Sequence, residues 1–502
     1  MLLKRFEHFI AQDAQRSAIT FGGQSYSYAA LNEAVERLRG SLAAQGVQRG
    51  DCVAVMLPNC PHFVIAHLAV LGLGAVSVPV NVQHKAREIA WQIEDTEARA
   101  FIGWENLAGE SEKAVSQAES LRLRVYLGDQ RPEGTHSLVD LITNGEKLPA
   151  AEDLDESALA AVMYTAGTGG HPRGVELTHG NFAAHAEETG GLLRIRESDV
   201  FSGTVPYSGI AGLTMCVHLP LAFGSEMHIQ SRFHPGDALH CLHDARVTVF
   251  VANPAAFAAM TGFPSAEKYD LTCLRYAISC ENKLTEQVAR DAEEKLKIRV
   301  FEGYGTTETG GLVALNLFPG LTERGSVGQP IRSHEIAVVD ESRMPVLAGV
   351  VGQVAVRGLS LMRGYHNRPE KTRQVMHDGW LLTGDRGYLD AQGNLFITGH
   401  SSALILKGGF PVCASELEEV IAGLPHVKDV AVVGVPDPVL GEEIRACVVL
   451  KEGAVIGPIE IIEYVRERVA AYKCPKTVKM YKELPRTTAG KIIRNQLKED
   501  RA

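Results

Sequence analysis

The sequence predicts an α/β protein of more than one domain, in which largely parallel sheets are built from βαβ units. At 502 residues, the chain is longer than a single hydrophobic core usually organises. Apolar residues recur at helical spacing through residues 26–43, and a continuous apolar run at 52–57 follows a turn. A second helix at 63–73 then leads into a second apolar run at 75–80. Strand, helix and strand in this succession indicate parallel strands joined by a crossover helix.

Further along the chain, short apolar runs continue this alternation. They predict additional strands at residues 100–102, 125–127, 247–252 and 274–279. Near the C-terminus, apolar runs at 430–435 and 446–450 alternate with helical segments. This change of pattern indicates a separate, small α+β unit at the end of the chain.

Composition and charge exclude several classes of protein. The formal net charge is −10, from 50 basic and 60 acidic residues, and no basic tract offsets it, which argues against nucleic acid as a partner. The nine cysteines are odd in number and include no C-x-x-C pair, so reduced thiols are favoured over a disulfide framework or a zinc site. The first residues lack the apolar core of a signal peptide, and a cytoplasmic location is expected.

One apolar segment, residues 62–80, is about long enough to cross a bilayer. It contains two histidines and three glycine or proline residues, and its flanks show no basic asymmetry. A buried helix followed by a strand is therefore favoured over a transmembrane span.

A glycine-rich stretch at residues 164–175 is the first candidate for chemistry. It follows the apolar run 159–163 and contains four glycines, two threonines and one arginine. Glycines permit positive φ and close approach to an anion, and successive amides form an anion-binding nest. The spacing matches neither the P-loop nor the dinucleotide G-x-G-x-x-G pattern, and a flexible turn is the alternative. The candidate polyphosphate ligands are Thr165, Ala166, Gly167, Thr168, Gly169, Gly170 and Arg173.

A second stretch, residues 300–309, ends an apolar run in Gly-Tyr-Gly-Thr-Thr-Glu. It offers an aromatic face, close backbone approach, two hydroxyls and the carboxylate of Glu308. Mg²⁺ in ATP chemistry is typically held by one or two carboxylates and by phosphate oxygens, whereas a solvated glutamate after a turn is the alternative. The candidate nucleotide and metal residues here are Tyr304, Gly305, Thr306, Thr307 and Glu308.

Two further motifs carry a charged residue next to a glycine. Asp385 follows Thr-Gly, and acidic side chains hold ribose hydroxyls in other nucleotide folds. Lys491 follows Gly490 in the stretch 484–494. Taken alone, such a lysine is more often a solvated surface residue.

Together these stretches resemble the adenylate-forming superfamily, which includes acyl-CoA synthetases, luciferases and peptide-synthetase adenylation domains. The family patterns read roughly Y-T-S-G-T-T-G-x-P-K-G-V, Y-G-x-T-E, T-G-D and P-R-T-x-x-G-K-I-x-R, in the same order as here. The resemblance implies that the glycine-rich loop and Arg173 hold pyrophosphate, that Glu308 holds Mg²⁺ and Asp385 holds ribose. It also implies that Lys491 bridges the acid and the α-phosphate.

The resemblance further implies a fold and a division into domains. A large N-terminal domain, residues 1–399, would contain βαβ-built sheets and a small β-barrel-like subdomain, and a small mobile α+β domain, residues 400–502, would follow a hinge near 400–404. Relatives read roughly G-R-x-x-D-x-I-K-x-G-G at this boundary. Here His400 stands at the arginine that contacts ribose and phosphate, and Ala403 at the hinge aspartate. Lys407, Gly408 and Gly409 would line the approach of a thiol.

Two other stretches depart from the family. Gly209 stands where an aromatic-box histidine usually lies, and no aspartate there would neutralise an amino acid's ammonium, so such a substrate is disfavoured. Relatives carry S-G-G-A-P-L facing adenine, where this chain has Cys280-Glu281-Asn282-Lys283 between the matching Ser279 and Leu284. An inert buried Cys280 is favoured over a nucleophile, and a structural His179 over a catalytic one. The expected acid-pocket residues are Tyr207, Gly209 and Gly303, with Met215 and Val313 beside them.

The function implied is that of an acyl-CoA synthetase for a fatty or aryl acid, with ATP, Mg²⁺ and CoA as cofactors. Adenylation replaces a poor leaving group by a phosphate monoester and depends on positioning and charge neutralisation. Two alternatives remain open: a ligase that loads carrier-protein phosphopantetheine, and a catalytically weakened nucleotide- or acyl-binding homologue. The resemblance also suggests a homodimer.

Overall fold

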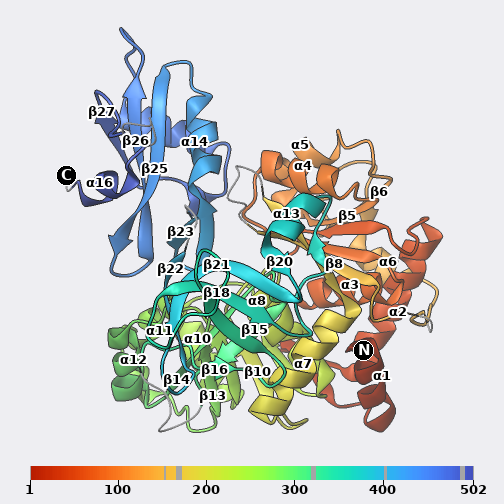
Figure 1. Ribbon diagram of the computed structural model, residues 1–502. Helices are drawn as coiled ribbons and strands as arrows, with labels where there is room; N and C mark the ends of the chain where they lie inside the picture. The colour runs from red at the N-terminus through yellow and green to blue at the C-terminus, as the bar shows by residue number, and fades with distance from the viewer. Residues whose placement is uncertain are drawn as a thin grey trace.

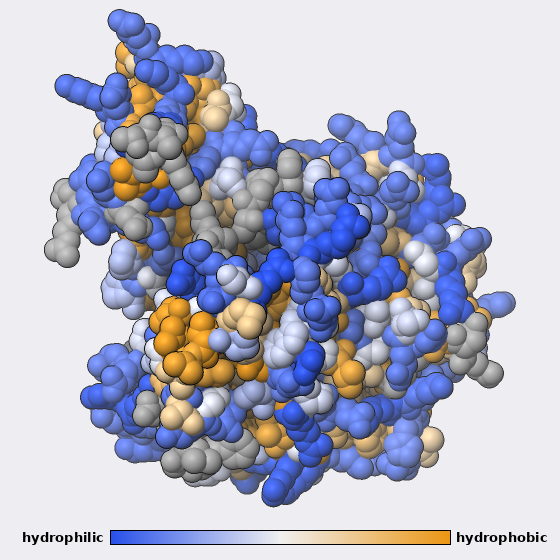
Figure 2. Space-filling view, in the orientation of Figure 1, coloured by the Kyte–Doolittle hydropathy of each residue, from blue (hydrophilic) through white to orange (hydrophobic). Residues whose placement is uncertain are grey.

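The computed structural model describes residues 2–151, 154–165, 172–317, 324–400, 404–486 and 492–500. It shows a large N-terminal domain and a small C-terminal domain that extends from it (Figure 1). The small domain here means the described residues from 404 onward. The predicted α/β class is confirmed, and Figure 2 shows that the viewed face is mostly hydrophilic.

A nine-stranded sheet carries most of the candidate residues. Its strands run in the order β16-β15-β14-β13-β12-β10-β11-β1-β2, and the five from β14 to β11 are mutually parallel. The strands are β1 (Ser17–Phe21), β2 (Gln24–Ser27), β10 (Val200–Gly203), β11 (Glu226–Ile229), β12 (Val249–Ala252), β13 (Tyr276–Ser279), β14 (Val300–Thr306), β15 (Gly311–Leu315) and β16 (Gln329–Pro330).

An eight-stranded sheet contains the first βαβ units predicted from the sequence. Its order is β19-β9-β8-β4-β3-β5-β6-β7, and β8 and β9 form an antiparallel hairpin. The strands are β3 (Cys52–Val55), β4 (Val76–Pro79), β5 (Ala100–Trp104), β6 (Leu123–Leu127), β7 (His136–Ser137), β8 (Leu159–Thr165), β9 (Arg173–Thr178) and β19 (Gly364–Tyr365).

The helices of the large domain cover these sheets, and several of them, such as α1, α2 and α4, are amphipathic. α2 begins at an N-cap, Ser27, whose hydroxyl accepts from the amide of Ala30, and it buries Leu31, Val35 and Leu38. The helices are α1 (Leu2–Gln12), α2 (Tyr28–Ala44), α3 (Pro61–Gly72), α4 (Ala86–Asp95), α5 (Ala108–Val115), α6 (Leu138–Asn144), α7 (His179–Leu193), α8 (Ile210–Leu213), α9 (Leu219–Ala222), α10 (Pro235–Asp244), α11 (Pro254–Thr261), α12 (Glu286–Asp291) and α13 (Pro369–Val375).

The apolar segment at residues 62–80 forms α3 and β4, both fully packed in the core. Among the described residues, no helix combines the length and the hydropathy that a membrane span requires. The preference for a buried helix and strand is therefore confirmed for this segment.

The remaining two sheets are antiparallel for the most part. The region predicted as a β-barrel-like subdomain is a five-stranded sheet of β17 (Glu335–Val339), β18 (Gly352–Arg357), β20 (Met376–His377), β21 (Trp380–Leu389) and β22 (Leu395–His400). The small domain has its own five strands and its own apolar core. They are β23 (Leu404–Lys407), β24 (Phe410–Cys413), β25 (Val427–Asp437), β26 (Gly441–Leu450) and β27 (Thr477–Tyr481), with α14 (Ala414–Ala422), α15 (Pro458–Arg466) and α16 (Arg494–Glu499).

Candidate active site

The carboxyl ends of four parallel strands of the nine-stranded sheet meet at one edge. β10, β12, β13 and β14 are neighbours in register, with Ala252 beside Ser279 and Ser279 beside Glu302. Ligands of open α/β sheets bind in the crevice outside such carboxyl ends. The segments after β10, β12 and β13 hold Tyr207, Asn253 and Glu281, and the predicted nucleotide residue Tyr304 lies near the end of β14.

The structure joins Tyr304 to Asp385, two residues predicted separately. The Tyr304 hydroxyl donates to Asp385 Oδ2 over 2.6 Å, and Asp385 is only 1% exposed. The amide of Asp385 also donates to Thr383 Oγ1 over 3.1 Å. Burial, followed by the Asp385 charge, raises the pKa of Tyr304 well above its usual value, so the phenol stays protonated and remains a donor.

A second group of contacts joins Arg173 to Glu308 through Tyr365. The Arg173 guanidinium lies 5.5 Å from the centre of the Tyr365 ring, within the range of a cation–π contact. The Tyr365 hydroxyl donates to Glu308 Oε1 over 3.0 Å. Among the described residues, no side chain donates to the other carboxylate oxygen of Glu308, so the group fits the role of a ligand to a hard cation.

The glycine-rich stretch follows β8 and leads into β9. The sequence predicted the first of these two strands. Thr165 ends β8 and pairs in register with Arg173, which begins β9. The predicted ligands at 166–170 lie outside the described residues. Next along the chain, α7 begins with a reciprocal cap in which Thr178 Oγ1 accepts from the Asn181 amide and Asn181 Oδ1 accepts from the Thr178 amide.

His179, the first residue of α7, is buried, and burial lowers its pKa to about 4. A neutral imidazole at this position agrees with the preference for a structural role. The thiol of Cys280 is also buried, and desolvation raises its pKa well above its usual value. A thiol held in this form is a poor nucleophile, in line with the expected inert role.

The residues expected to bind the acid carry no charged side chain. Tyr207 is 3% exposed and its ring centre lies 5.7 Å from that of Phe63. A side chain at Gly209 would meet only the Pro206 carbonyl, at 3.4 Å, so there is open space at this position. At Gly303, by contrast, an added Cβ would lie 3.0 Å from Leu312 Cδ2.

The Gly408–Gly409 turn of the small domain contacts the carboxyl-end edge directly. Asn253 Nδ2 donates to the Gly408 carbonyl over 3.4 Å, and an added Cβ at Gly409 would lie 2.9 Å from Glu281 Oε2. Lys407, which was predicted to line the same path, directs its ammonium into the small domain. It pairs with Glu443 at 2.6 Å and donates to the Cys474 carbonyl over 3.2 Å.

A buried ionic group holds the two domains together elsewhere. Lys473 of the small domain forms an ion pair with Glu88 of α4, and its ammonium also pairs with Glu416 at 2.8 Å. All three side chains are at most 7% exposed. Glu88 Oε2 accepts in addition from the Ala470 amide over 3.0 Å, so one carboxylate of the large domain engages two groups of the small domain.

Beside this group, a hollow of about 560 Å³ lies between α4–α5 and the end of α15. Four cations and two carboxylates line it, which gives it an excess of positive charge. Two of the cations are balanced locally, Lys113 by Glu110 at 2.9 Å and Arg468 by Glu467 at 3.1 Å. The lining residues are Lys85, Glu110, Lys113, Arg466, Glu467 and Arg468.

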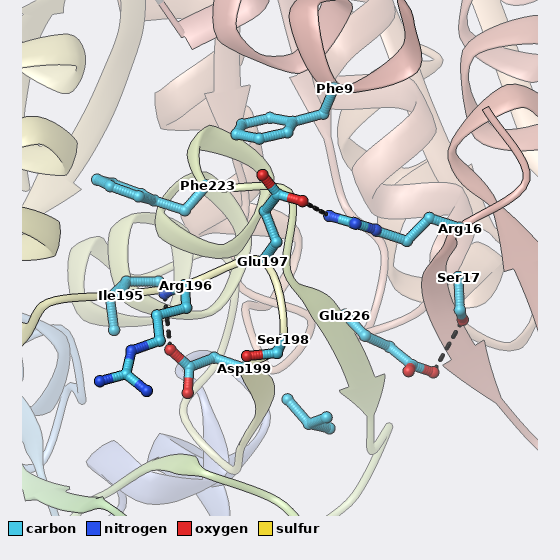
Figure 3. A pocket seen from close by; sticks show the side chains of 11 residues that line it. Phe9, Arg16, Ser17, Ile195, Arg196, Glu197, Ser198, Asp199, Phe223 and Glu226 are labelled. Atoms are coloured by element: carbon cyan, nitrogen blue, oxygen red, sulfur yellow. Dashed lines mark hydrogen bonds and ion pairs between the residues drawn. The ribbon is translucent and has the colours of Figure 1, made fainter. Parts of the chain in front are cut away.

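A larger hollow, of about 740 Å³, lies at the opposite edge of the nine-stranded sheet. Val200 and Glu226 in its lining are the first residues of β10 and β11, so it lies at the amino ends of these strands. Figure 3 shows its polar groups paired with one another, Arg16 with Glu197 and Ser17 with Glu226. Ligand crevices in such sheets lie at the carboxyl ends, so this hollow is separate from the candidate active site.

Several predicted residues lie at or beyond the limits of the described chain. Lys491 and Ala403 lie outside the described residues, and nothing is described of the His400 side chain, although its backbone pairs with Asp385. The segment that carries Lys491 begins and ends in the small domain, where Arg486 pairs with Ile492. α16 follows it, on the side of the small domain away from the large one (Figure 1).

The sequence did not identify Tyr365, Asn253 or the Glu88–Lys473 pair. Tyr365 is separated from Glu308 by 57 residues and Glu88 from Lys473 by 385, so no local spacing indicates either contact. Glu281 was visible only as a departure from the glycine of the family pattern.

Comparison with known proteins identifies the family. Residues 6–366 match the AMP-binding enzyme model and residues 416–491 match the AMP-binding enzyme C-terminal domain. The chain belongs to the AMP-binding enzyme family. The predicted enzyme class, a ligase of the acyl-CoA synthetase kind that uses ATP, Mg²⁺ and CoA, is confirmed at the level of this family.

Individual relatives share the whole length of the chain. A long-chain-fatty-acid–CoA ligase of Bacillus subtilis is 30% identical over 98% of this chain and 92% of its own. A 2-succinylbenzoate–CoA ligase of Geobacillus kaustophilus is 32% identical over 96% and 95%. Among solved structures, an o-succinylbenzoate CoA synthetase double mutant of Bacillus subtilis with a bound product analogue, OSB-NCoA, matches with TM-score 0.90 and 27% identity over 99% and 98% of the two chains. ATP-bound MatB of Rhodopseudomonas palustris matches with TM-score 0.73 and 29% identity, covering 99% of each chain.

Proposed function

We propose that this protein is an AMP-forming acyl-CoA synthetase that activates an apolar carboxylic acid, fatty or aryl. The observation that carries the proposal is the pair of contacts Tyr304–Asp385 and Arg173–Tyr365–Glu308. They connect three separate sequence motifs around the end of β14. Such an arrangement suits attack of one anion on another, which depends on positioning and charge neutralisation.

The roles of the site residues follow from their chemistry. Arg173 and the loop from Thr165 to Gly170 would hold the departing pyrophosphate, and Asp385, oriented by Tyr304, would accept hydrogen bonds from ribose hydroxyls. Glu308 would hold Mg²⁺, oriented by the Tyr365 hydroxyl. When bound, this cation neutralises phosphate charge.

Lys491 is proposed as the cation that bridges the acid and the α-phosphate. We further propose that the domains divide at residues 399–400 and that the small domain rotates about a hinge near 400–404, which brings this lysine in for adenylation and removes it for thioester formation. Two observations support the rotation. The Gly408–Gly409 turn occupies the carboxyl-end edge, and the chain matches the structure with a bound CoA product analogue better than the ATP-bound structure at similar identity.

The apolar nature of the acid is proposed from Tyr207, Gly209 and Gly303, the expected lining. None of the three carries a charge, and the open space at Gly209 suits a bulky acyl group. Gly209→His should therefore narrow the range of acids that support activity toward smaller ones. An unchanged size preference would remove Gly209 from the pocket.

CoA is proposed as the acceptor in preference to a carrier protein because of the cationic hollow at the domain interface. CoA carries phosphates beyond its pantetheine arm, and the excess of positive charge around Lys85 and Arg466 suits them. If the hollow binds these phosphates, Lys85→Ala and Arg466→Ala should each raise the KM for CoA by up to about fivefold and leave that for pantetheine unchanged. Equal effects on both acceptors would contradict this assignment.

ATP–pyrophosphate exchange tests the activity itself. Octanoate, benzoate and alanine would be compared as acids, with Lys491→Ala as the control. Exchange with an apolar acid, lost in the variant, is the expected result. ATP binding without exchange for any acid would favour the alternative, a catalytically weakened homologue. A cytoplasmic location and a homodimer stay predictions.

A further inference from the structure

Glu281 occupies a position at the candidate site where the family pattern has a glycine. It lies two residues beyond the end of β13, next to the segments that follow β12 and β14. Its backbone φ is +74°, in the left-handed region that L-residues with a long side chain rarely adopt. A glutamate held in this conformation beside a ligand crevice suggests a functional reason for the side chain.

The carboxylate of Glu281 faces the small domain. Its Oε2 atom lies 2.9 Å from the point where a Cβ of Gly409 would be, and Asn253 Nδ2 lies 3.2 Å from the same point. The φ of Gly409, +93°, also favours glycine at this position. With its amide oriented so that the oxygen faces the turn, Asn282 accepts a hydrogen bond from the Gly409 amide. Glu281 and the Gly408–Gly409 turn therefore form one continuous surface between the domains.

The surroundings of Glu281 favour a proton acceptor of moderate strength. Burial raises the pKa of Glu281 to about 7, and the Asn253 amide opposes this shift only in part. The titratable groups that interact with it are the thiols of Cys216 and Cys280, whose own pKa values burial raises. Among the described residues, no cation contributes to its pKa. A base with a pKa near the working pH is well matched to accept a proton during reaction.

A second glutamate nearby provides a contrast. Burial also raises the pKa of Glu302, in β14, to about 7. Its Oε1 atom, however, accepts from the Leu284 amide over 2.8 Å and so holds the turn that follows β13. Glu302 thus shares the pKa of Glu281 without its contact to the small domain.

We propose that Glu281 accepts the proton of the thiol that attacks the acyl-adenylate. In this step, the thiol proton moves to a Glu281 oxygen as the sulfur forms a bond to the acyl carbon. The bond from that carbon to the phosphate oxygen then breaks, and AMP leaves with the electron pair. Glu281 returns its proton to solvent. The assignment rests on the proposed function, because it requires an acyl-adenylate and a thiol at this site.

The test separates the two half-reactions. Synthetic octanoyl-AMP and CoA would be mixed with enzyme in a single turnover, and ATP–pyrophosphate exchange with octanoate or benzoate would be measured in parallel. For Glu281→Gln we expect exchange within twofold of wild type and thioester formation slower by about 100-fold, a typical contribution of general base catalysis. The wild-type thioester rate should level off above about pH 7, whereas that of the variant should keep rising through pH 8 as free thiolate forms.

Two further variants keep the outcome interpretable. Glu281→Gly, which suits the positive φ, should fold well and show the same selective loss, whereas Glu302→Gln should retain the pH dependence. Equal losses in both half-reactions would assign Glu281 to acid binding instead, and an unchanged thioester rate would remove it from the reaction. Wild-type enzyme without exchange for any acid would overturn the proposed function. Thioester formation from octanoyl-AMP would still test Glu281 in that case.

Discussion

The small domain contacts the large domain in two regions of opposite character. One region is the buried ionic group of Lys473, Glu88 and Glu416. The other is the Gly408–Gly409 turn on Asn253 and Glu281, where glycine backbone replaces side chains. Buried charges are costly to separate, whereas a glycine turn allows close approach without an ion pair. The comparison indicates that the ionic group stabilises this domain arrangement, whereas the turn brings glycine backbone close to the Glu281 carboxylate.

Loss of the Lys473 ammonium, which lies between Glu88 and Glu416, should have the largest effect on stability. Lys473→Met would leave Glu88 and Glu416 buried without their cation, and breaking a buried pair in this way typically costs about 3–5 kcal/mol. We expect a lower free energy of unfolding by urea denaturation. A loss under 1 kcal/mol would mean that water already reaches the group and that the two regions do not differ as described.

The pH dependence of stability should reveal the titrating group in the second region. Because the pKa of Glu281 rises from 4.5 to about 7 on folding, the folded protein binds more protons than the unfolded chain between these values. The contribution of Glu281 to the free energy of unfolding therefore falls by about 1–3 kcal/mol as the pH rises from about 4.5 to about 7. The free energy of unfolding of Glu281→Gln, relative to that of wild type, should therefore increase by this amount between pH 5 and pH 8. Parallel stability curves for the two proteins would contradict the raised pKa of this carboxyl group.

Removing the charge on the large-domain side alone should affect the domain arrangement more than the fold. Glu88→Gln keeps the shape and one acceptor for the Ala470 amide but weakens the bond to Lys473. We expect thioester formation to slow by about tenfold, the scale of one charge-assisted hydrogen bond, with pyrophosphate exchange unchanged or faster. Equal slowing of both half-reactions would show that the contact serves folding and not the choice of domain arrangement.

The smallest effect is expected from a matched surface pair. Arg87 of α4 contacts Glu419 of α14 at 3.2 Å across the same interface, but both side chains are about half exposed. Solvent screening limits such pairs to less than about 1 kcal/mol, so Arg87→Ala should leave both half-reactions and the unfolding curve nearly unchanged. A larger effect would show that charge alone, without burial, holds the domains together.

The sequence alone determined the local elements and most of the chemistry. Helical spacing predicted α2, and the succession of continuous apolar runs and a helical segment predicted α3, β3 and β4, because these patterns are properties of neighbouring residues. The motifs around Thr165, Glu308 and Asp385 indicated nucleotide chemistry for the same reason, since each combines its functional groups within a few residues.

Only the tertiary structure decided which of these residues meet. Tyr304 is 81 residues from Asp385, and Arg173 reaches Glu308 through a tyrosine of the neighbouring strand β19, so strand order and the packing of the sheets determine both contacts. The tertiary structure also decides the contact between Glu281 and Gly409 and the ion pair between Glu88 and Lys473. Their pairing depends on the relative position of two domains, which no short stretch of sequence encodes. The physical reason is that burial and charge pairing depend on distance in space, and local spacing constrains that distance only within one element.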